Sequence, residues 1–189
     1  DEGQVIKRHR VVVGNTNIEI DDKRRLFGPF NYSRMLVSEI ENIVLNPKWR
    51  VPDRITMDEL ELELIADPAY FENHAYEIET RADGTESVTQ GSGDANALGR
   101  IKLNFQNPFA IYLHDTPAKP YFERTIRAFS HGCMRVHEAV DLGYYLLERF
   151  TGKTRQEVDA IYETLEETSI TLPEPIPIYV EYNAVSIDD

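Results

Sequence analysis

The fold is most clearly encoded between Arg100 and Arg135, where the chain reads RIKLNFQNPFAIYLHDTPAKPYFERTIRAFSHGCMR. Residues 100–105 alternate polar and apolar side chains, a pattern typical of a strand with one buried face. Residues 109–114 are apolar and rich in aromatic side chains, and residues 106–108 (QNP) separate the two runs. The pattern predicts two neighbouring strands.

Further strands are predicted on both sides of this pair. Residues 9–20 carry β-branched side chains around Gly14 and predict a strand or a hairpin with a bend. Residues 43–45 form a short apolar run closed by Asn46-Pro47, which predicts a buried strand. Residues 176–182 alternate again and predict a final strand.

Two helices are predicted after the Cys133 region. Thr154 and Glu157 have the spacing of a capping box, which predicts a helix ending near residue 165. The preceding helix ends at Gly152 and presents one apolar face, made of Ala139, Leu142, Gly143, Leu146 and Phe150. Strands therefore dominate both ends of the chain, and residues 1–189 are expected to form a single mostly-β domain of the α+β class with C-terminal helices.

Residues 53–99 differ in composition from the rest and are expected to form an insertion within this domain. Thr56 and Glu59 have capping-box spacing, so a helix is predicted from about residue 57 to residue 66. Asp67-Pro68 then predicts a second short helical turn, because proline is well placed at a helix start.

The second half of the insertion is predicted to be extended and then irregular. Residues 74–80 read as an extended segment, whereas residues 81–99 are rich in Gly, Ser, Asp and Asn and predict a loop. Acidic side chains dominate residues 53–86, against Arg54 and Arg81. We therefore expect the insertion to be a capping lid outside the main core, with a solvated surface decoration as the alternative.

Composition and charge exclude several classes of protein. The chain has 20 Lys and Arg residues against 33 Asp and Glu residues, a net charge of −13, so nucleic acid and anionic membranes are poor partners. No apolar run approaches the roughly 18 residues of a membrane-spanning helix. The chain begins at Asp1 without a signal-like stretch, which indicates a processed protein or an excised piece. The segment from Arg100 to Arg135 is locally basic, which favours either an anionic ligand such as a carboxylate or neutralisation of the acidic insertion.

Cys133 is the only cysteine, which excludes an internal disulfide and a multi-cysteine zinc site. It follows His131 and Gly132, and His114 ends a predicted strand. Cysteine chemistry needs a thiolate, which Arg135 and the N-terminus of the following helix would both favour. An inert buried thiol is the alternative on residue type alone.

A metal site is a second interpretation of the same region. His114, His131, Cys133 and His137 could supply four ligands. His-x-Cys-x-x-x-His is not a usual zinc spacing, however, and no cysteine pair anchors it, so no metal is expected.

His114, a spacer of fifteen residues and Ser130-His131-Gly132-Cys133-Met134-Arg135 resemble the signature of the L,D-transpeptidase catalytic domain, the YkuD-type fold. Residues 96–102, 112–116 and 122–129 extend the match. The chain is most similar to the Gram-negative branch, in which the catalytic domain carries an inserted capping subdomain. Many family members have Asn where this chain has Arg135, which leaves open whether Arg135 contacts a substrate carboxylate or supports the loop.

The resemblance implies a β-sandwich-like catalytic domain and a periplasmic enzyme of peptidoglycan synthesis, cell-wall biogenesis and cell shape. Such enzymes cut a tetrapeptide stem between residues three and four, release D-Ala and hold the acyl group on cysteine. They then pass it to the side-chain amine of residue three of an acceptor stem, which forms a 3-3 cross-link. The resemblance also implies carbapenem-type β-lactams as covalent inhibitors and no cofactor.

The resemblance also implies roles for individual residues. Cys133 would be the nucleophile and His114 its base, oriented by the backbone carbonyl of Asp115. His131 and the backbone amides of Gly132 and Cys133 would bind the oxyanion. The remaining candidates are Ser130 for orienting the loop and, for substrate binding, Arg135, Arg127 and Tyr112. For an arginine the alternative is a structural or surface ion pair, and for Tyr112 it is a place in the core.

Two other functions remain open. The first is a hydrolase on the same site, in which water replaces the acceptor amine, acting as an L,D-carboxypeptidase or releasing a protein linked to peptidoglycan. The second is a non-enzymatic wall-binding or metal-binding module, against which the intact pair of His114 and Cys133 argues.

Overall fold

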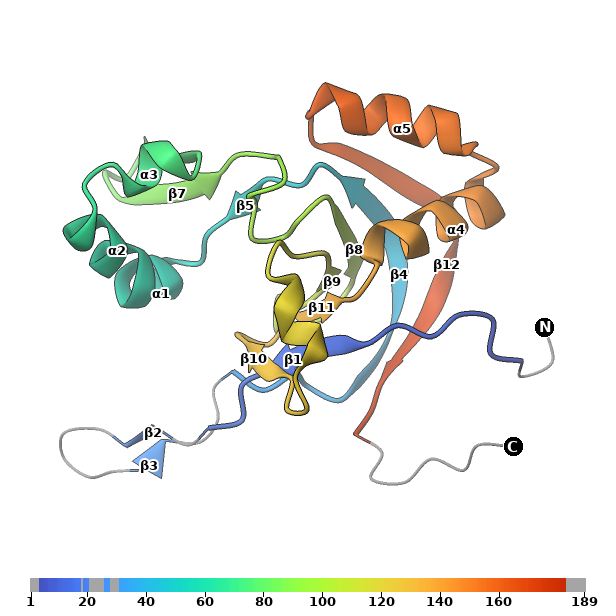
Figure 1. Ribbon diagram of the computed structural model, residues 1–189, viewed down its shortest axis with the longest axis horizontal. Helices are drawn as coiled ribbons and strands as arrows, with labels where there is room; N and C mark the ends of the chain where they lie inside the picture. The colour runs from blue at the N-terminus through green and yellow to red at the C-terminus, as the bar shows by residue number, and fades with distance from the viewer. Residues whose placement is uncertain (1–3, 18, 21–25, 28–30, 183–189) are drawn as a thin grey trace.

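The computed structural model describes residues 4–17, 19–20, 26–27 and 31–182 of the chain. Its main body is one mixed sheet of seven strands (Figure 1). The β1/β10 and β9/β11 pairs are parallel, and the other neighbours in the sheet are antiparallel. The strand order is β10 (Ala128–Ser130), β1 (Val11–Gly14), β11 (Met134–Val136), β9 (Leu113–His114), β8 (Ile101–Phe105), β4 (Leu36–Leu45) and β12 (Thr168–Val180). The prediction of a mostly-β α+β fold is confirmed.

The main core lies between this sheet and two C-terminal helices, α4 (Ala139–Thr151) and α5 (Arg155–Thr164). The face predicted for α4 is the buried one, and a side chain at Gly143 would collide with Ile101, so glycine lets the helix approach β8 closely. Gly152 ends α4 in a left-handed conformation, and Thr154 opens α5 with a complete capping box, both as predicted.

Two strands differ in length from their predictions. The strand predicted over 109–114 is confined to β9, because Ala110 is left-handed and the Asn107 side chain binds backbone groups on both sides of it. In the other direction, β12 begins at Thr168 rather than at Ile176, because it pairs with β4 along most of its length. Its prolines are tolerated because β12 is the edge strand of the sheet.

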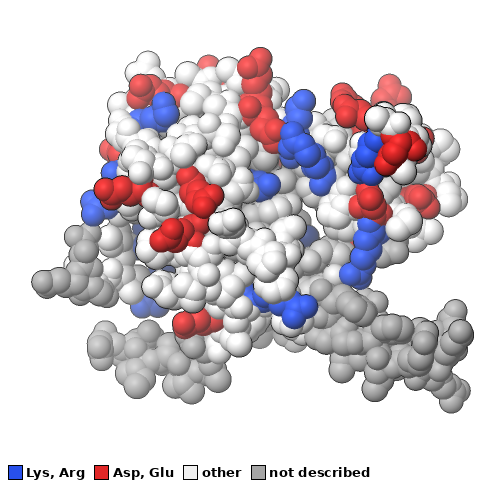
Figure 2. Space-filling model, turned by 180° about the vertical axis from the view of Figure 1, so that it is seen from behind, with Lys and Arg blue, Asp and Glu red and all other residues white. Residues whose placement is uncertain are grey.

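The insertion contains a second, three-stranded sheet that is separate from the main one. Its strand order is β5 (Trp49–Arg50), β7 (Glu86–Gln90) and β6 (Tyr76–Thr80), and β5 lies just before the insertion in sequence. Its separate core consists of the buried residues Val51, Leu60 and Val88 and their partly buried neighbours, most of which are aromatic. The helical segments are α1 (Asp53–Ile55), the π-helical turn Thr56–Leu60, α2 (Glu61–Ala66) and α3 (Tyr70–Asn73). Figure 1 shows the insertion at one end of the molecule, with α4 and α5 toward the other. Figure 2 shows acidic side chains on the insertion and also over the rest of this face of the molecule.

Two sequence predictions need correction here. The helix does not start at a Thr56 cap: it begins at Asp53, directly after Pro52, and no side chain caps it. The loop predicted over 81–99 is wrong at residues 86–90, which form β7 between β5 and β6. Val88 is the one large apolar side chain of β7, so the strand has too little apolar alternation to stand out in sequence. A short pairing of β2 (Glu19–Ile20) with β3 (Leu26–Phe27) was also not predicted.

Within the described part of the chain, every helix is too short or too polar to cross a bilayer.

Candidate active site

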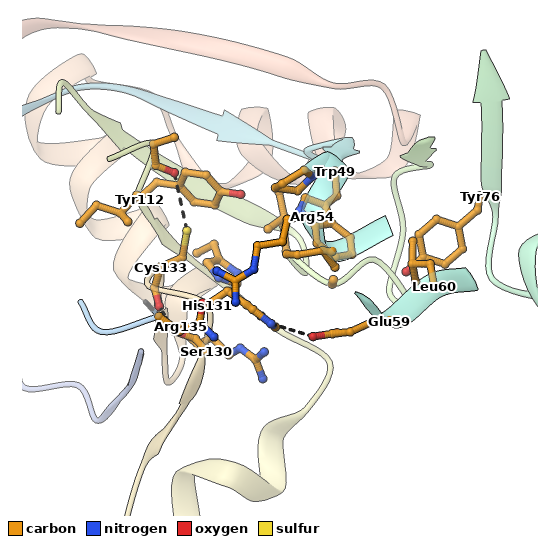
Figure 3. Close-up of a pocket in the computed structure, with 18 of the residues that line it drawn as sticks. Trp49, Arg54, Glu59, Leu60, Tyr76, Tyr112, Ser130, His131, Cys133 and Arg135 are labelled. Carbon is orange, nitrogen blue, oxygen red and sulfur yellow. Dashed lines mark hydrogen bonds and ion pairs between the residues drawn. The ribbon is translucent and has the colours of Figure 1, made fainter. Parts of the chain in front are cut away.

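A cavity of about 500 Å³ opens between the insertion and the main sheet (Figure 3). The main sheet and its loops contribute the polar and reactive side of the cavity, whereas the insertion and β5 contribute the opposite wall. From the sheet side come Tyr112, His114, Ser130, His131, Cys133 and Arg135, and from the opposite wall Trp49, Arg54, Glu59, Leu60, Tyr70 and Tyr76. The structure therefore places most of the predicted site residues in one cavity.

The loop between β10 and β11 presents the half-buried Cys133 thiol, and serine hydroxyls fix it from two sides. Ser130 Oγ donates to the carbonyl of Cys133 and accepts the backbone N–H of Gly132 at 3.2 Å. Ser33 Oγ donates to the carbonyl of Gly132 at 2.7 Å and accepts the backbone N–H of Gly14 at 2.9 Å. Gly132 has a φ of 117°, which a side chain would strain, so glycine is required at this turn.

His114 is buried at the end of β9, and its Nδ1 hydrogen-bonds to the backbone carbonyl of Asp115, as expected from the sequence. The Asp115 carboxylate in turn accepts the backbone N–H of Arg100 at 3.1 Å and pairs with Lys119, which fixes the carbonyl that holds the ring. Because Nδ1 donates to a carbonyl, Nε2 is the ring nitrogen left to accept a proton.

The electrostatics of the site keep both reactive groups uncharged at rest. Burial, with help from the charges of Arg135 and Lys102, lowers the pKa of His114 to about 4. Burial also raises the pKa of the Cys133 thiol, although hydrogen bonds from Tyr112 and the charges of Lys102 and Arg135 oppose this effect. The resting pair is therefore a thiol and a neutral imidazole, and the proton must move as the sulfur attacks.

Tyr112 connects the thiol to its surroundings. Hydrogen bonding by its phenol group favours the thiolate and lowers the pKa of Cys133, and its ring lies edge-on to His114 with 5.6 Å between ring centroids. The thiol itself donates a long contact of 3.9 Å to the carbonyl of Ala110 (Figure 3). Tyr112 therefore lies where its hydroxyl group favours the thiolate.

Replacing Tyr112 with phenylalanine is expected to raise the pKa of the Cys133 thiol by about one to two pH units. A hydrogen bond to a charged group contributes roughly 1.5–3 kcal/mol, and the substitution removes that bond while it keeps the ring. The rate of iodoacetamide alkylation of Cys133, measured against pH, gives the thiol pKa directly. An unchanged profile would show that the phenol does not stabilise the thiolate.

The other predicted residues have distinct environments. The Nε2 atom of His131 lies 2.7 Å from Glu59 Oε1, so an insertion residue contacts the cysteine loop. Arg135 lines the cavity, and its buried Nε has no hydrogen-bond partner among the described residues. Arg127 lies outside the cavity, where its guanidinium binds the carbonyls of Val11 and Arg124 at 3.2 and 3.0 Å, which fits the structural alternative.

His137, the fourth ligand of the metal interpretation, is also outside the cavity. Its ring lies edge-on to Phe122, with 5.1 Å between ring centroids, and its Nδ1 lies 3.8 Å from Glu138. The four side chains of that interpretation therefore do not converge.

Three residues of the site were not identified from the sequence. By residue type Trp49 could line a peptide groove, although an aromatic residue beside a strand is more often part of the core. Glu59 was expected to act only as a capping residue, and Lys102 was noted only as one of several basic residues. Residues 46–49 (NPKW) also have a counterpart in the branch that the chain resembles, and this was a usable signal for Trp49. Nothing in the local sequence marks Glu59 or Lys102.

Comparison with known families defines the class of this protein. The family model of the L,D-transpeptidase catalytic domain (YkuD) matches residues 1–173, and the chain therefore belongs to that family. Among curated proteins, it is similar to one from Haemophilus influenzae named "Putative L,D-transpeptidase", with 30% identity over 204 aligned positions. The alignment covers all of this chain and 39% of the relative's length, so the chain spans less than half of that protein.

Proposed function

We propose that this chain is a peptidoglycan L,D-transpeptidase, a cysteine acyltransferase that joins two stem peptides through a 3-3 cross-link. One observation carries the proposal: a half-buried Cys133 thiol shares a cavity with a neutral His114 whose Nδ1 is engaged by the Asp115 carbonyl. This arrangement supplies the nucleophile and the base that acyl transfer requires. Membership of the family supports peptidoglycan as the substrate.

In the first half-reaction, His114 Nε2 takes the thiol proton while the Cys133 sulfur attacks the carbonyl carbon of residue three in a tetrapeptide stem. The imidazolium then gives this proton to the nitrogen of D-Ala, whose bond to that carbon breaks. D-Ala leaves, and a thioester remains on Cys133.

In the second half-reaction, the side-chain amine of residue three of an acceptor stem attacks the thioester. His114 takes a proton from this amine and returns it to the sulfur as the carbon–sulfur bond breaks. The thiol is regenerated, and one amide bond has replaced another.

The donors proposed for the tetrahedral oxygen are His131 and the backbone amides of Gly132 and Cys133. In this structure the amide of Gly132 is bound to Ser130 Oγ and His131 faces Glu59, so the reacting carbonyl has to compete for both donors. The Cys133 amide, at the nucleophile itself, completes the proposed set. Arg135 is proposed to bind a stem carboxylate, because its buried Nε is an unpartnered donor at the cavity.

Product analysis tests the proposed function directly. Incubated with a disaccharide-tetrapeptide, the protein is expected to release D-Ala and to form a 3-3 cross-linked dimer, both measured by mass spectrometry. A carbapenem is expected to leave one covalent adduct on Cys133. Hydrolysed tripeptide without dimer would assign the hydrolase instead, and absence of every product from a folded protein with a reactive thiol would overturn both. A periplasmic location is part of the proposal, because peptidoglycan is built there.

We further propose that the insertion acts as a lid over the cavity. Insertion residues form one wall of the cavity, and the contact between Glu59 and His131 joins the insertion to the cysteine loop (Figure 3). A closed lid excludes water from the thioester and so favours attack by an amine over hydrolysis.

Replacing Glu59 with alanine is expected to raise the ratio of hydrolysed tripeptide to cross-linked dimer by up to about fivefold. The two side chains of the pair are 51% and 38% exposed, so the contact contributes at most about 1 kcal/mol to closure. Glu61→Ala is the matched control, since it removes the same charge from the neighbouring helix. Equal product ratios in both variants and the wild type would contradict the lid.

A further inference from the structure

Three side chains lie in one row across the main sheet, with His114 at its centre. Lys102 of β8 is the antiparallel partner of His114, and Arg135 of β11 is its parallel partner on the other side. Directly opposed residues in neighbouring strands project to the same face of a sheet. The candidate base is therefore flanked by two cations.

We propose that Lys102 is a positioning residue of the active site, whose ammonium group, held over Tyr112, disfavours the imidazolium form of His114 and favours the anionic form of Cys133. The proposal rests on the proposed roles of Cys133 and His114. Its test reads the protonation of these two groups and needs no substrate.

The ammonium group of Lys102 is held in place by an aromatic ring rather than by a carboxylate. Its Nζ lies 4.1 Å from the centroid of Tyr112, and no carboxylate of the described residues lies within ion-pair distance of it. A cation over a ring keeps its full charge, whereas an ion pair would cancel it. Lys102 is also half-buried, so solvent screens its charge less than at the surface.

Each group of the site faces a defined set of charges. Arg135, Lys102 and both the carbonyl and the carboxylate of Asp115 act on His114, and Tyr112, Lys102 and Arg135 act on Cys133. Lys102 itself faces Cys133, Glu167 and Arg50, and burial lowers its pKa. Glu59 acts on Arg135 from the insertion side. Lys102 and Arg135 are the two cations common to both reactive groups.

The positive charge of Lys102 is expected to lower the pKa of His114 and the pKa of Cys133 alike. A cation disfavours the imidazolium ion, which lowers the pKa of His114, and favours the thiolate, which lowers the pKa of Cys133. Loss of the charge is therefore expected to raise both values. Loss of packing has a different signature, because added water raises the pKa of a buried histidine but lowers that of a buried thiol.

The test is the replacement of Lys102 with methionine, which keeps the apolar stem and removes the charge. Both pKa values are expected to rise by about half a unit to one unit, which slows iodoacetamide alkylation at pH 7 roughly threefold to tenfold. Alkylation against pH reports Cys133, and NMR of ¹³C-labelled histidine reports His114, whose signal is assigned by its loss in His114→Gln.

Two further variants make the outcome decisive. Lys102→Arg keeps the charge over the ring and is expected to stay within about twofold of the wild-type alkylation rate. Lys153→Met, in the turn between α4 and α5, removes the same charge far from the cavity and is expected to leave both values unchanged. A fall in the thiol pKa together with a rise at His114 would assign Lys102 a packing role. If neither pKa changed in Lys102→Met, the proposal would also be overturned. Release of D-Ala by that same variant would then leave the proposed function standing.

Discussion

Replacement of Cys133 with alanine is expected to lower kcat/KM for D-Ala release by a factor of at least about a thousand. The sulfur is the nucleophile of the first half-reaction, and neither the methyl group of alanine nor the hydroxyl group of Cys133→Ser can form a thioester. The fold is expected to survive, because the side chain is only half-buried and the serine contacts of the loop use backbone groups.

Steady-state kinetics on a tetrapeptide substrate, with circular dichroism as the check on folding, measures this effect. Full activity in a folded Cys133→Ala variant would rule out the cysteine mechanism. Metal analysis of the wild type is the complementary measurement, because stoichiometric zinc and loss of activity on chelation would restore the metal interpretation.

Replacement of His114 with glutamine is expected to be nearly as damaging as the loss of Cys133. The glutamine amide can still donate to the Asp115 carbonyl, but its oxygen cannot accept and return a proton. Because the two side chains act as one proton-transfer unit, the double variant is expected to be little worse than either single variant. A His114→Gln variant that kept the wild-type turnover would move the base to His131.

The same variant is expected to flatten the dependence of stability on acid. The pKa of His114 is about 4 in the folded protein and near 6.5 in an unfolded chain, so the unfolded state binds the extra proton between these values. The folded state is therefore destabilised as the pH falls through this window, by about 3 kcal/mol over its full width, and is unaffected above it. Urea unfolding of the wild type and of His114→Gln at several values between about pH 4.5 and pH 7 gives the free energy of unfolding against pH. The slope of this dependence is then compared between the two proteins.

Local patterns predicted much of the main domain. The α4 face, the Gly152 stop, the Thr154 capping box and the β8 strand all depend on residues close in sequence, and all four are confirmed. The serine, glycine and cysteine of the loop after β10 were likewise apparent as a contiguous motif. These features need no knowledge of which strands are neighbours.

The remaining features depend on long-range pairing. Lys102, His114 and Arg135 meet only because β9 lies between β8 and β11, and parallel pairing of β9 with β11 leaves no local trace. Glu59 was predicted within a helix, yet its contact with His131 depends on how the whole insertion folds over the sheet. The strand β7 was missed for a related reason, since pairing on both sides compensates for its polar composition.

Because the insertion has a core of its own, the two walls of the cavity are expected to differ in the free energy of local opening. Among the described residues, the core of the insertion has three buried apolar side chains, Val51, Leu60 and Val88, whereas the main core extends over the sheet and both C-terminal helices. Amide protons of β6 and β7 should therefore exchange with solvent through local opening that costs less free energy than opening of β8 or β4. The wall that carries Glu59 is thus the more readily remodelled one, and substitutions there can alter what enters the cavity while the frame that holds Cys133 and His114 stays folded.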